Sequence, residues 1–342
     1  MVVGYIRIGD RRAVVSPCDR DVHIARGVVL EPTGKRRYAS VIEVVYPLRH
    51  SRRLGVAEPV LVGGDVNSTI ACALVAVKKG IPVIHVEAGL RSGDRTMPEE
   101  INRVLTDQIS ELLFTTEKSA ADNLLREGIN PDCIHFAGNV MIDTLRYNLA
   151  QAIPAMATTS GLKKNGTRVD LTKGYGLVTL HRPANVDHPE VLQSLLSVLA
   201  DISRDIPLVF PVHPRTRQRI IDAGLEPMIA SSALHMTGPL GYLEMLGMMK
   251  DARLVLTDSG GIQEETTALG VPCVTLRENT ERPITVEQGT NTIVGTDPQA
   301  IHACVADILR TGGKSGCIPE LWDGQAEERI VETIALWSNG SR

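Results

Sequence analysis

The chain has 342 residues, of which 43% are hydrophobic, and its formal net charge is −4 at pH 7. This length and apolar content suffice for two domains, each with its own core. The small negative charge excludes a general attraction to nucleic acid or to an anionic membrane, so phosphate recognition has to be local. No apolar run approaches the roughly 18 residues of a membrane span. Six cysteines without a C-x-x-C pair predict reduced thiols, no metal site and a cytoplasmic protein.

Residues 1–55 differ in charge from the rest of the chain. They contain 11 Lys/Arg and 5 Asp/Glu, a net charge of +6, which leaves −10 (25 minus 35) for the remainder. We therefore treat them as an anomalous N-terminal segment.

From Pro59 onward, short β-branched runs alternate with longer amphipathic segments, which is the pattern of βαβ units and a parallel sheet. Residues 56–154 are predicted to form an N-terminal domain, and 155–172, rich in Thr, Gly, Lys and Asn, are interpreted as a linker. The predicted strands are 60–62, 83–87, 112–115 and 134–137, and the predicted helices are 67–79, 98–110, 117–127 and 140–150.

Residues 155–324 repeat this alternation and form the predicted C-terminal domain. The predicted strands are 176–180, 207–211, 254–257, 272–276 and 292–294, and the predicted helices are 189–203, 214–223, 241–250, 262–269 and 297–310. A last helix at 325–338, within a C-terminal segment 325–342, is expected to cross back onto the first domain. The fold class is therefore α/β, with two doubly wound domains that bind ligand in a cleft at the carboxyl ends of their strands.

The stretch 254–265 is the strongest candidate for a ligand site. An apolar strand leads through Ser259, Gly260 and Gly261 into a helix whose first N–H groups would face an anion, and the glycines would let a ligand approach closely. Glu264 and Glu265, expected in the first turn, would accept from sugar hydroxyls beside a bound phosphate. The alternative is an ordinary connection in which Asp258 or Ser259 caps the helix.

Polar side chains also follow other predicted strands. Asp65 and Glu87 end two strands of the first domain, and Glu99 begins a helix, where the macrodipole favours a carboxylate that acts as a base. Crowded carboxylates raise one another's pKa, so that one can hold a proton while another accepts one. The alternatives are a helix cap for Asp65 and an ion pair between Glu87 and Arg91. His85, in mid-strand, is interpreted as a satisfied core histidine.

In the second domain, His181, Arg182 and His213 follow strands, and Arg282 follows another strand end. We expect His181 and Arg182, with the Ser-Gly-Gly turn, to form an anion site suited to a diphosphate leaving group. His213 could instead brace a turn, and Arg282 could form a salt bridge with Glu281 or Glu287.

With these residues in place, the sequence resembles the non-hydrolysing UDP-N-acetylglucosamine 2-epimerases. The matching motifs run in order from about residue 59: LVGGD (61–65), HVEAGLRSGD (85–94), PEEINR (98–103), GNVMID (138–143), TLHRPANVD (179–187), FPVHPR (210–215), TDSGGIQEE (257–265) and TERP (280–283). The resemblance implies a GT-B-type pair of Rossmann-like domains, usually in a homodimer. It also implies interconversion of UDP-GlcNAc and UDP-ManNAc by elimination and re-addition of UDP, with no metal or redox cofactor.

The resemblance also assigns roles to individual residues by motif position. Asp65, Glu87 and Glu99 match the catalytic carboxylates, and His181 matches the histidine beside the diphosphate. The matches to nucleotide contacts are Ser259, Gly260, Gly261, Glu265 and Arg282. Leu240 and Met245 fall where the family contacts the uracil, although core packing explains them equally well. Which carboxylate is the base stays open.

Residues 1–55 lack the family's opening strand and Gly-Thr-Arg-Pro-Glu motif, so we expect a truncated, rearranged or mis-read N-terminus. In an active epimerase, substitute cations such as Arg7, Arg11 or Arg12 would meet the phosphates. The alternatives are a protein that binds UDP-sugar with lost turnover and, more weakly, a hydrolysing epimerase that releases ManNAc. A glycosyltransferase is disfavoured by the carboxylate motifs.

Overall fold

The computed structural model describes residues 29–30, 36–37, 59–164 and 167–340. Arg7, Arg11 and Arg12 therefore lie outside the described residues. The described chain forms two compact units: unit 1 comprises the residues up to Val140 together with those from Asp323 onward, and unit 2 comprises Met141–Trp322. A short antiparallel pair, β1 (Val29–Leu30) and β2 (Arg36–Arg37), precedes the main body of unit 1.

Unit 1 contains a four-stranded sheet whose described strands are all parallel and follow one another in space in chain order. The strands are β3 (Val60–Gly63), β4 (Val83–Ala88), β5 (Leu112–Thr115) and β6 (Ile134–Phe136). The helices are α1 (Asn67–Lys78), α2 (Pro98–Gln108), α3 (Lys118–Arg126), the 3₁₀ turn η1 (Pro131–Cys133) and α14 (Ala326–Gly340). Helix α4 (Val140–Leu149) begins at the end of this unit and continues into unit 2.

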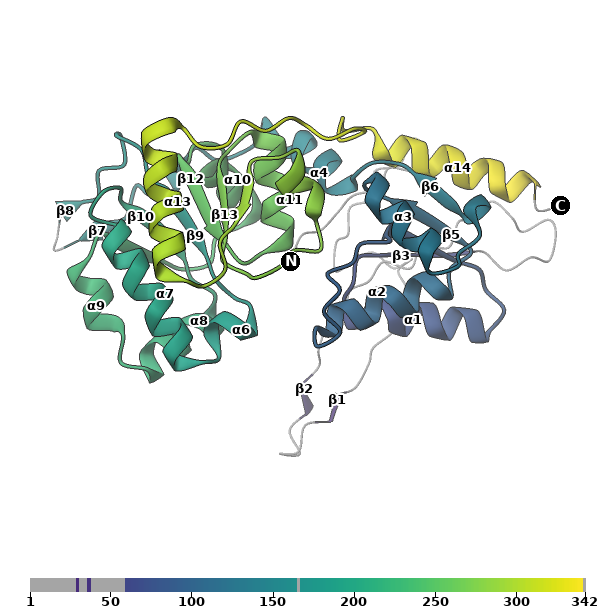
Figure 1. Cartoon of the computed structure of the whole chain (residues 1–342), viewed down its shortest axis with the longest axis horizontal. Coiled ribbons are helices and arrows are strands. Elements are labelled where there is room, and N and C mark those ends of the chain that lie inside the picture. The colour runs from purple at the N-terminus through teal and green to yellow at the C-terminus, as the bar shows by residue number, and fades with distance from the viewer. Residues whose placement is uncertain (1–28, 31–35, 38–58, 165–166, 341–342) are drawn as a thin grey trace. The chain divides into compact units, whose positions relative to one another are not determined.

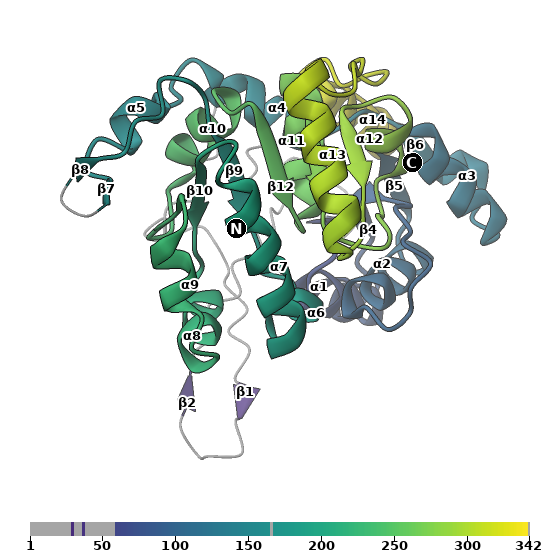
Figure 2. The ribbon, with the colours of Figure 1, turned by 60° about the vertical axis from the view of Figure 1, so that its left-hand side comes forward.

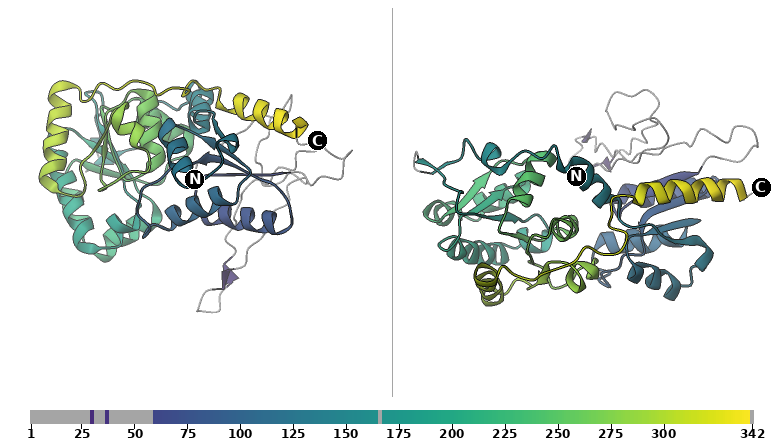
Figure 3. Two further views of the ribbon diagram at one scale, coloured as in Figure 1. Left: turned by 45° about the vertical axis from the view of Figure 1, so that its right-hand side comes forward. Right: turned by 90° about the horizontal axis from the view of Figure 1, so that it is seen from above.

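Alternating residues of β4 face the two sides of this sheet. Ile84 and Val86 pack with Ile330 and Ile334 of α14 on one side, whereas Val83 packs with α1 on the other. Figures 1 and 3 show α14 along one face of the sheet and α1 and α2 along the opposite face. Both faces of the sheet are covered, as is usual for parallel sheets.

Unit 2 contains a six-stranded sheet in which every described pairing is parallel. Its strands lie in the order β11-β10-β9-β12-β13-β14. The bounds are β9 (Gly176–Thr179), β10 (Leu208–Pro211), β11 (Leu234–Thr237), β12 (Leu254–Thr257), β13 (Cys273–Thr275) and β14 (Asn291–Ile293). Numbered from β9, this is the 3-2-1-4-5-6 order of a Rossmann sheet, whose strand order reverses between β9 and β12.

Helices cover both faces of the unit 2 sheet. Val178 and Phe210 point into a core lined by α7, α8, α9 and α13, whereas Leu177 and Val209 point into one lined by α4, α5 and α10. Figure 2 shows α7 and α13 over the first of these faces. The helices are α5 (Ala155–Thr158), α6 (Pro183–Val186), α7 (Pro189–Ile202), α8 (Pro214–Asp222), α9 (Glu226–Ser231), α10 (Tyr242–Lys250), α11 (Gly260–Leu269), α12 (Pro283–Glu287) and α13 (Pro298–Thr311).

The predicted strands and longer helices are all present, with ends that differ by no more than a few residues. The sequence analysis missed β11 and the short helices α6, α9 and α12. It also took 155–172 for a linker, although these residues include α5 and the antiparallel pair β7 (Lys163–Lys164) and β8 (Thr167–Arg168). Ala155 and Leu171 are buried in a core of unit 2, so this segment is part of that unit.

The compact units divide after Val140 and Trp322, whereas the sequence analysis placed domain boundaries after residues 154 and 324. That domain division stays a prediction. Within the ranges that the structure describes, no helix combines the length and the apolar character needed to cross a bilayer.

Candidate active site

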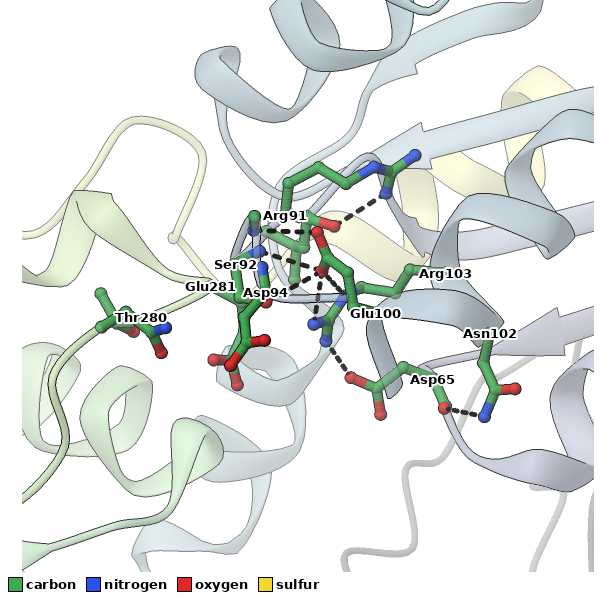
Figure 4. Close-up of polar contacts among 12 residues, drawn as sticks. Asp65, Arg91, Ser92, Asp94, Glu100, Asn102, Arg103, Thr280 and Glu281 are labelled. Carbon is green, nitrogen blue, oxygen red and sulfur yellow. Dashed lines mark hydrogen bonds and ion pairs between the residues drawn. The ribbon is translucent and has the colours of Figure 1, made fainter. Parts of the chain in front are cut away.

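In unit 1, Asp65 follows β3 and its carboxylate forms an ion pair with Arg103 of α2. Figure 4 shows the Arg103 guanidinium between the carboxylates of Asp65 and Glu100. The side chain of Arg103 is buried, whereas that of Asp65 retains 26% of its exposure, so Asp65 is held in place at the edge of the site. Helix α1 has Val66 as its N-cap residue, without a side-chain cap. The alternative interpretation of Asp65 as a helix cap is therefore wrong.

Glu100 is a buried residue that binds several groups of unit 1, and the sequence analysis did not single it out as a candidate. Its carboxylate accepts from the backbone N–H groups of Ser92 (3.0 Å) and Gly93 (2.9 Å), and it pairs with Arg103 at 2.8 Å. Burial alone would raise the pKa of Glu100, but these donors outweigh it and lower that pKa. The i,i+3 spacing of Glu100 and Arg103 in the motif PEEINR was the signal that could have found the pair.

Glu87 has a backbone conformation that side chains other than glycine rarely adopt. Its φ is +72°, and the pairing of β4 with β5 shifts register between Val86 and Ala88, so Glu87 lies in a bulge. Its carboxylate lies over Gly64, because a Cβ added to Gly64 would be 3.6 Å from Oε2 of Glu87. Such strain costs on the order of 1 kcal/mol or more and is typical of functional sites.

The other acidic candidate, Glu99, lies as predicted in the first turn of α2, directly after Pro98. The recorded ion pairs of Arg91 run to Asp107 (2.7 Å) and Glu127 (2.6 Å) rather than to Glu87. The three predicted carboxylates thus come from the ends of two neighbouring strands and from the start of the helix that supplies Arg103.

In unit 2, the candidate residues lie where the strand order reverses. His181 follows β9, and Ser259 follows β12, the neighbouring strand. In Rossmann sheets, ligands bind outside the carboxyl ends of the two strands at this point. The hydroxyl groups of Thr179 and Thr257, at the ends of the same two strands, are 2.6 Å apart and join them.

Asp258 is a functional residue that sequence reasoning assigned only as a possible cap. Its buried carboxylate accepts from the backbone N–H groups of His181 (3.0 Å) and Arg182 (2.9 Å) and lies 3.0 Å from Nδ1 of His181. Burial alone would raise the pKa of Asp258, but His181 and the two N–H groups lower it. Asp258 therefore fixes both the turn after β9 and the orientation of the His181 ring.

Helix α11 begins at Gly260 with Ser259 as its N-cap residue, as the capping alternative expected, although the Ser259 side chain forms no cap hydrogen bond. A Cβ on Gly260 would lie 2.5 Å from Nη1 of Arg282, and one on Gly261 would lie 3.0 Å from Cε of Met141. The glycines thus make room for protein side chains, and whether they also let a ligand approach closely stays a prediction. The first N–H groups of α11 still have no acceptor within the helix.

Arg282 is buried and pairs with Glu281 (2.6 Å) and Glu264 (2.8 Å). The salt bridge with Glu281 that we considered as an alternative is therefore present. Glu281 also pairs with Arg277 at 2.7 Å and lies 3.5 Å from Arg182. Burial alone would raise the pKa of Glu281, but these three arginines lower it far below its usual value. Three guanidinium groups and two carboxylates thus lie together beside the start of α11.

Glu264 and Glu265 lie in the second turn of α11, since the helix starts at Gly260, and not in the first turn as predicted. Glu264 forms an ion pair with Arg282, whereas the buried Glu265 accepts a hydrogen bond of 3.0 Å from the hydroxyl of Tyr242. Burial raises the pKa of Glu265 to about 7. Glu265 is therefore a buried acid with a neutral partner.

The remaining candidates of unit 2 have structural roles in the described residues. His213 is the exposed N-cap residue of α8, and its ring accepts from the N–H of Arg215, which confirms the turn-bracing interpretation. Leu240 and Met245 are half-buried and pack against the core that includes α10. Whether any of the three also contacts a ligand stays a prediction.

Comparisons with known proteins agree with the motifs. The family model of UDP-N-acetylglucosamine 2-epimerase matches residues 29–335, and so begins nearer the N-terminus than the motifs at about residue 59. The UDP-N-acetylglucosamine 2-epimerase of Methanocaldococcus jannaschii is 40% identical over 317 residues, which cover 92% of this chain and 83% of that protein. The enzyme of the same name from Methanococcus maripaludis is 46% identical over 255 residues, covering 74% and 69%.

Solved structures of UDP-GlcNAc 2-epimerases are similar to this chain as well. The crystal structure of the Methanocaldococcus jannaschii epimerase in complex with UDP-GlcNAc and UDP has a TM-score of 0.74 and 42% identity, with 82% of this chain and 76% of that chain covered. The Neisseria meningitidis epimerase bound to UDP-GlcNAc has a TM-score of 0.70 and 32% identity, with 80% and 75% covered. The expected α/β fold class with two parallel sheets is confirmed. This chain belongs to the UDP-N-acetylglucosamine 2-epimerase family.

Proposed function

We propose that this protein is a non-hydrolysing epimerase that interconverts UDP-GlcNAc and UDP-ManNAc. A base removes the C2 proton, the bond from C1 to the UDP oxygen breaks, and a C1–C2 double bond forms in a 2-acetamidoglucal. UDP then adds back to C1 while a proton is delivered to the opposite face of C2. The observation that carries the proposal is the set of three carboxylates, two at the ends of neighbouring strands and one at the start of α2, in a chain of this family.

We assign the binding of the nucleotide to unit 2. The start of α11, the ordered His181–Arg182 turn and the arginines of the cluster would neutralise the charge that develops on the β-phosphate as UDP leaves. Glu265 would accept from the ribose hydroxyls. We assign the other predicted contacts, among them the apolar pair Leu240 and Met245, to the uracil and the phosphates.

Unit 1 is assigned the proton transfers. The strained backbone of Glu87 supports a functional role, since such a conformation persists only where its surroundings enforce it. Glu99, in the first turn of α2, is assigned the abstraction of the proton. Asp65, which is held in place by Arg103, would act with Glu87 in delivering a proton to the opposite face of C2.

We also propose a cytoplasmic homodimer. Helices α1 and α2 pack together and carry exposed apolar side chains, including Leu74, Val75, Ile101 and Leu105, which a partner surface could cover. Sedimentation velocity tests the assembly, and a monomer at all concentrations would contradict it.

The test of the reaction is exchange of the C2 proton of UDP-GlcNAc with solvent deuterium, followed by NMR with the purified full chain. Exchange together with the appearance of UDP-ManNAc supports the proposal. Binding without exchange would instead favour a UDP-sugar-binding protein, and free ManNAc with UDP would favour the hydrolysing reaction.

Substitution separates the proposed roles. Glu87→Gln and Glu99→Gln should each lower kcat by about 10²–10⁴-fold, which is the usual contribution of a positioned acid or base, with a smaller effect on UDP binding. Glu328→Gln, an exposed position of α14, is the matched control. Turnover at the wild-type rate in Glu87→Gln would refute the assignment.

A further inference from the structure

His85 is a fully buried histidine of β4 for which the proposed reaction has no role. Its Nδ1 lies 2.6 Å from Oδ1 of Asp107 near the end of α2, and its Nε2 lies 3.0 Å from the carbonyl oxygen of Gly64. Gly64 is the residue directly before Asp65, and His85 is two residues before Glu87. The imidazole ring therefore joins the two strand ends that carry these carboxylates.

The partners of His85 determine its protonation. The carbonyl oxygen of Gly64 can only accept, so Nε2 carries a proton. Asp107 is also an acceptor for the N–H of Gly89 (3.1 Å) and for Arg91 (2.7 Å), which are contacts of an ionised carboxylate. An ionised carboxylate has no proton to donate, so Nδ1 carries a proton as well. His85 is therefore an imidazolium paired with a buried carboxylate.

The electrostatic surroundings agree with this geometry. Burial alone would lower the pKa of His85, but Asp107 outweighs it and raises that pKa. Burial alone would raise the pKa of Asp107, but His85 and Arg91 lower it. Glu87 also acts on the imidazole and raises its pKa, and Glu127 forms a second ion pair with Arg91.

The same pair holds the strained bulge. Asp107 binds His85 and the N–H of Gly89, which lie on either side of Glu87. Gly64 in turn donates its N–H to the carbonyl of Val86 at 3.2 Å and accepts from His85 through its own carbonyl. The left-handed conformation of Glu87 and the turn before Asp65 are thus fixed by one buried ion pair.

We infer that His85 and Asp107 are positioning residues for the acid–base chemistry of unit 1: they hold the Gly64 turn and the Glu87 bulge, and the charged imidazole ring acts electrostatically on Glu87. This inference rests on the proposed function for its kinetic consequences, but the structure of the pair does not depend on that function. The imidazolium and Glu87 attract each other, so removing the charge of the ring in a variant should weaken the preference of Glu87 for its ionised form.

Asp107→Asn is the sharpest variant. The asparagine oxygen can accept from Gly89 and Arg91, and its NH₂ can donate to a neutral Nδ1 of His85, whose Nε2 still donates to Gly64. Every hydrogen bond is retained while the charge on His85 is lost. His85→Asn is the complementary variant, because its shorter side chain keeps a donor toward Asp107 but cannot reach Gly64.

The first measurement is the ¹⁵N NMR spectrum of the histidine rings in the wild-type protein between about pH 5 and 9. We expect His85 to stay doubly protonated above the ordinary histidine pKa of about 6.5 and to become neutral in Asp107→Asn. A wild-type ring that is neutral at pH 8 would overturn the inference, whether or not the protein turns over UDP-GlcNAc and whether or not a variant folds.

The second measurement is the pH profile of kcat and kcat/KM. Asp107→Asn should lower kcat about tenfold with a KM within about threefold, and the acidic limb should move to higher pH, by about one unit for a tenfold change in proton affinity. His85→Asn should lower kcat and speed amide exchange at Gly64. His302→Gln, an exposed position of α13, should change neither. Wild-type profiles in folded Asp107→Asn and His85→Asn would refute the inference while leaving the proposed function intact.

Discussion

The buried Glu265 gives the most quantitative prediction of the structure. Its carboxyl group is 4% exposed and has the Tyr242 hydroxyl as its recorded hydrogen-bond donor, and its pKa rises from 4.5 to about 7 because burial disfavours the charged form. Since the folded protein binds this proton more tightly than the unfolded chain does, ionisation of Glu265 opposes folding. The stability of the ligand-free protein should therefore fall as pH rises from about 4.5 to about 7.

Glu265→Gln measures this effect. The amide oxygen can accept from Tyr242 as the carboxyl group does, but the side chain cannot ionise. A shift of about 2.5 units at about 1.36 kcal/mol per unit predicts that the variant is more stable than wild type by about 3 kcal/mol above pH 7, with the difference vanishing near pH 4.5.

The assay is urea unfolding of both proteins at several pH values between about 4.5 and 8.5, with the ligand absent. Glu226→Gln, an exposed position in unit 2, should show no pH-dependent difference from wild type. A difference between Glu265→Gln and wild type that stays constant across this pH range would refute the argument from burial. So would a variant that is less stable than wild type at pH 8.

The remaining predictions concern the same site and its scaffold. Binding of UDP should release a proton near pH 6, because ribose hydroxyls donating to Glu265 favour its ionised form; calorimetry in two buffers of different ionisation enthalpy counts the proton, and a count of zero would contradict the contact. Asp258→Asn should destabilise the protein by about 1–3 kcal/mol at neutral pH, because it removes the buried carboxylate that accepts from the backbone N–H groups of His181 and Arg182. Since the pKa of Asp258 is lowered on folding, this penalty should shrink as pH falls toward and below 3.8, which acid-dependent urea unfolding would show. Gly89→Ala should abolish folding or cost several kcal/mol, because its Cβ would lie 2.4 Å from a backbone oxygen of α3 in addition to the strain of φ +79°, whereas Gly93→Ala, with φ +74° and open space, should cost only about 1 kcal/mol in thermal unfolding.

The sequence by itself determined the order and type of the main elements. Alternation of short β-branched runs with amphipathic segments is a local signal, so β5 (Leu112–Thr115) and β12 (Leu254–Thr257) were predicted with their observed bounds. Strand ends in parallel sheets meet at one edge, which is why Asp65 and Glu87 could be predicted to lie near each other. The remaining candidate site residues were predicted from the motifs that the chain shares with the family.

Short elements and buried partners could not be obtained in this way. Helices α9 and α12 have too few residues for a periodic pattern, and β11 depends on its pairing with β10. Whether Gly260 lies against a ligand or against Arg282 depends on tertiary packing, which the local sequence does not determine.

Which ionisable side chains pair with one another, and which of them are charged, was decided only by the tertiary structure. Asp258 could have capped a helix, but it binds the turn after β9 because β9 and β12 are neighbours in space and distant in sequence. His85 was correctly predicted to be a satisfied core histidine, yet its charge depends on Asp107 and Gly64, which lie 22 and 21 residues away along the chain. Protonation is set by burial and by the atoms within hydrogen-bonding distance, and these exist only once the chain has folded.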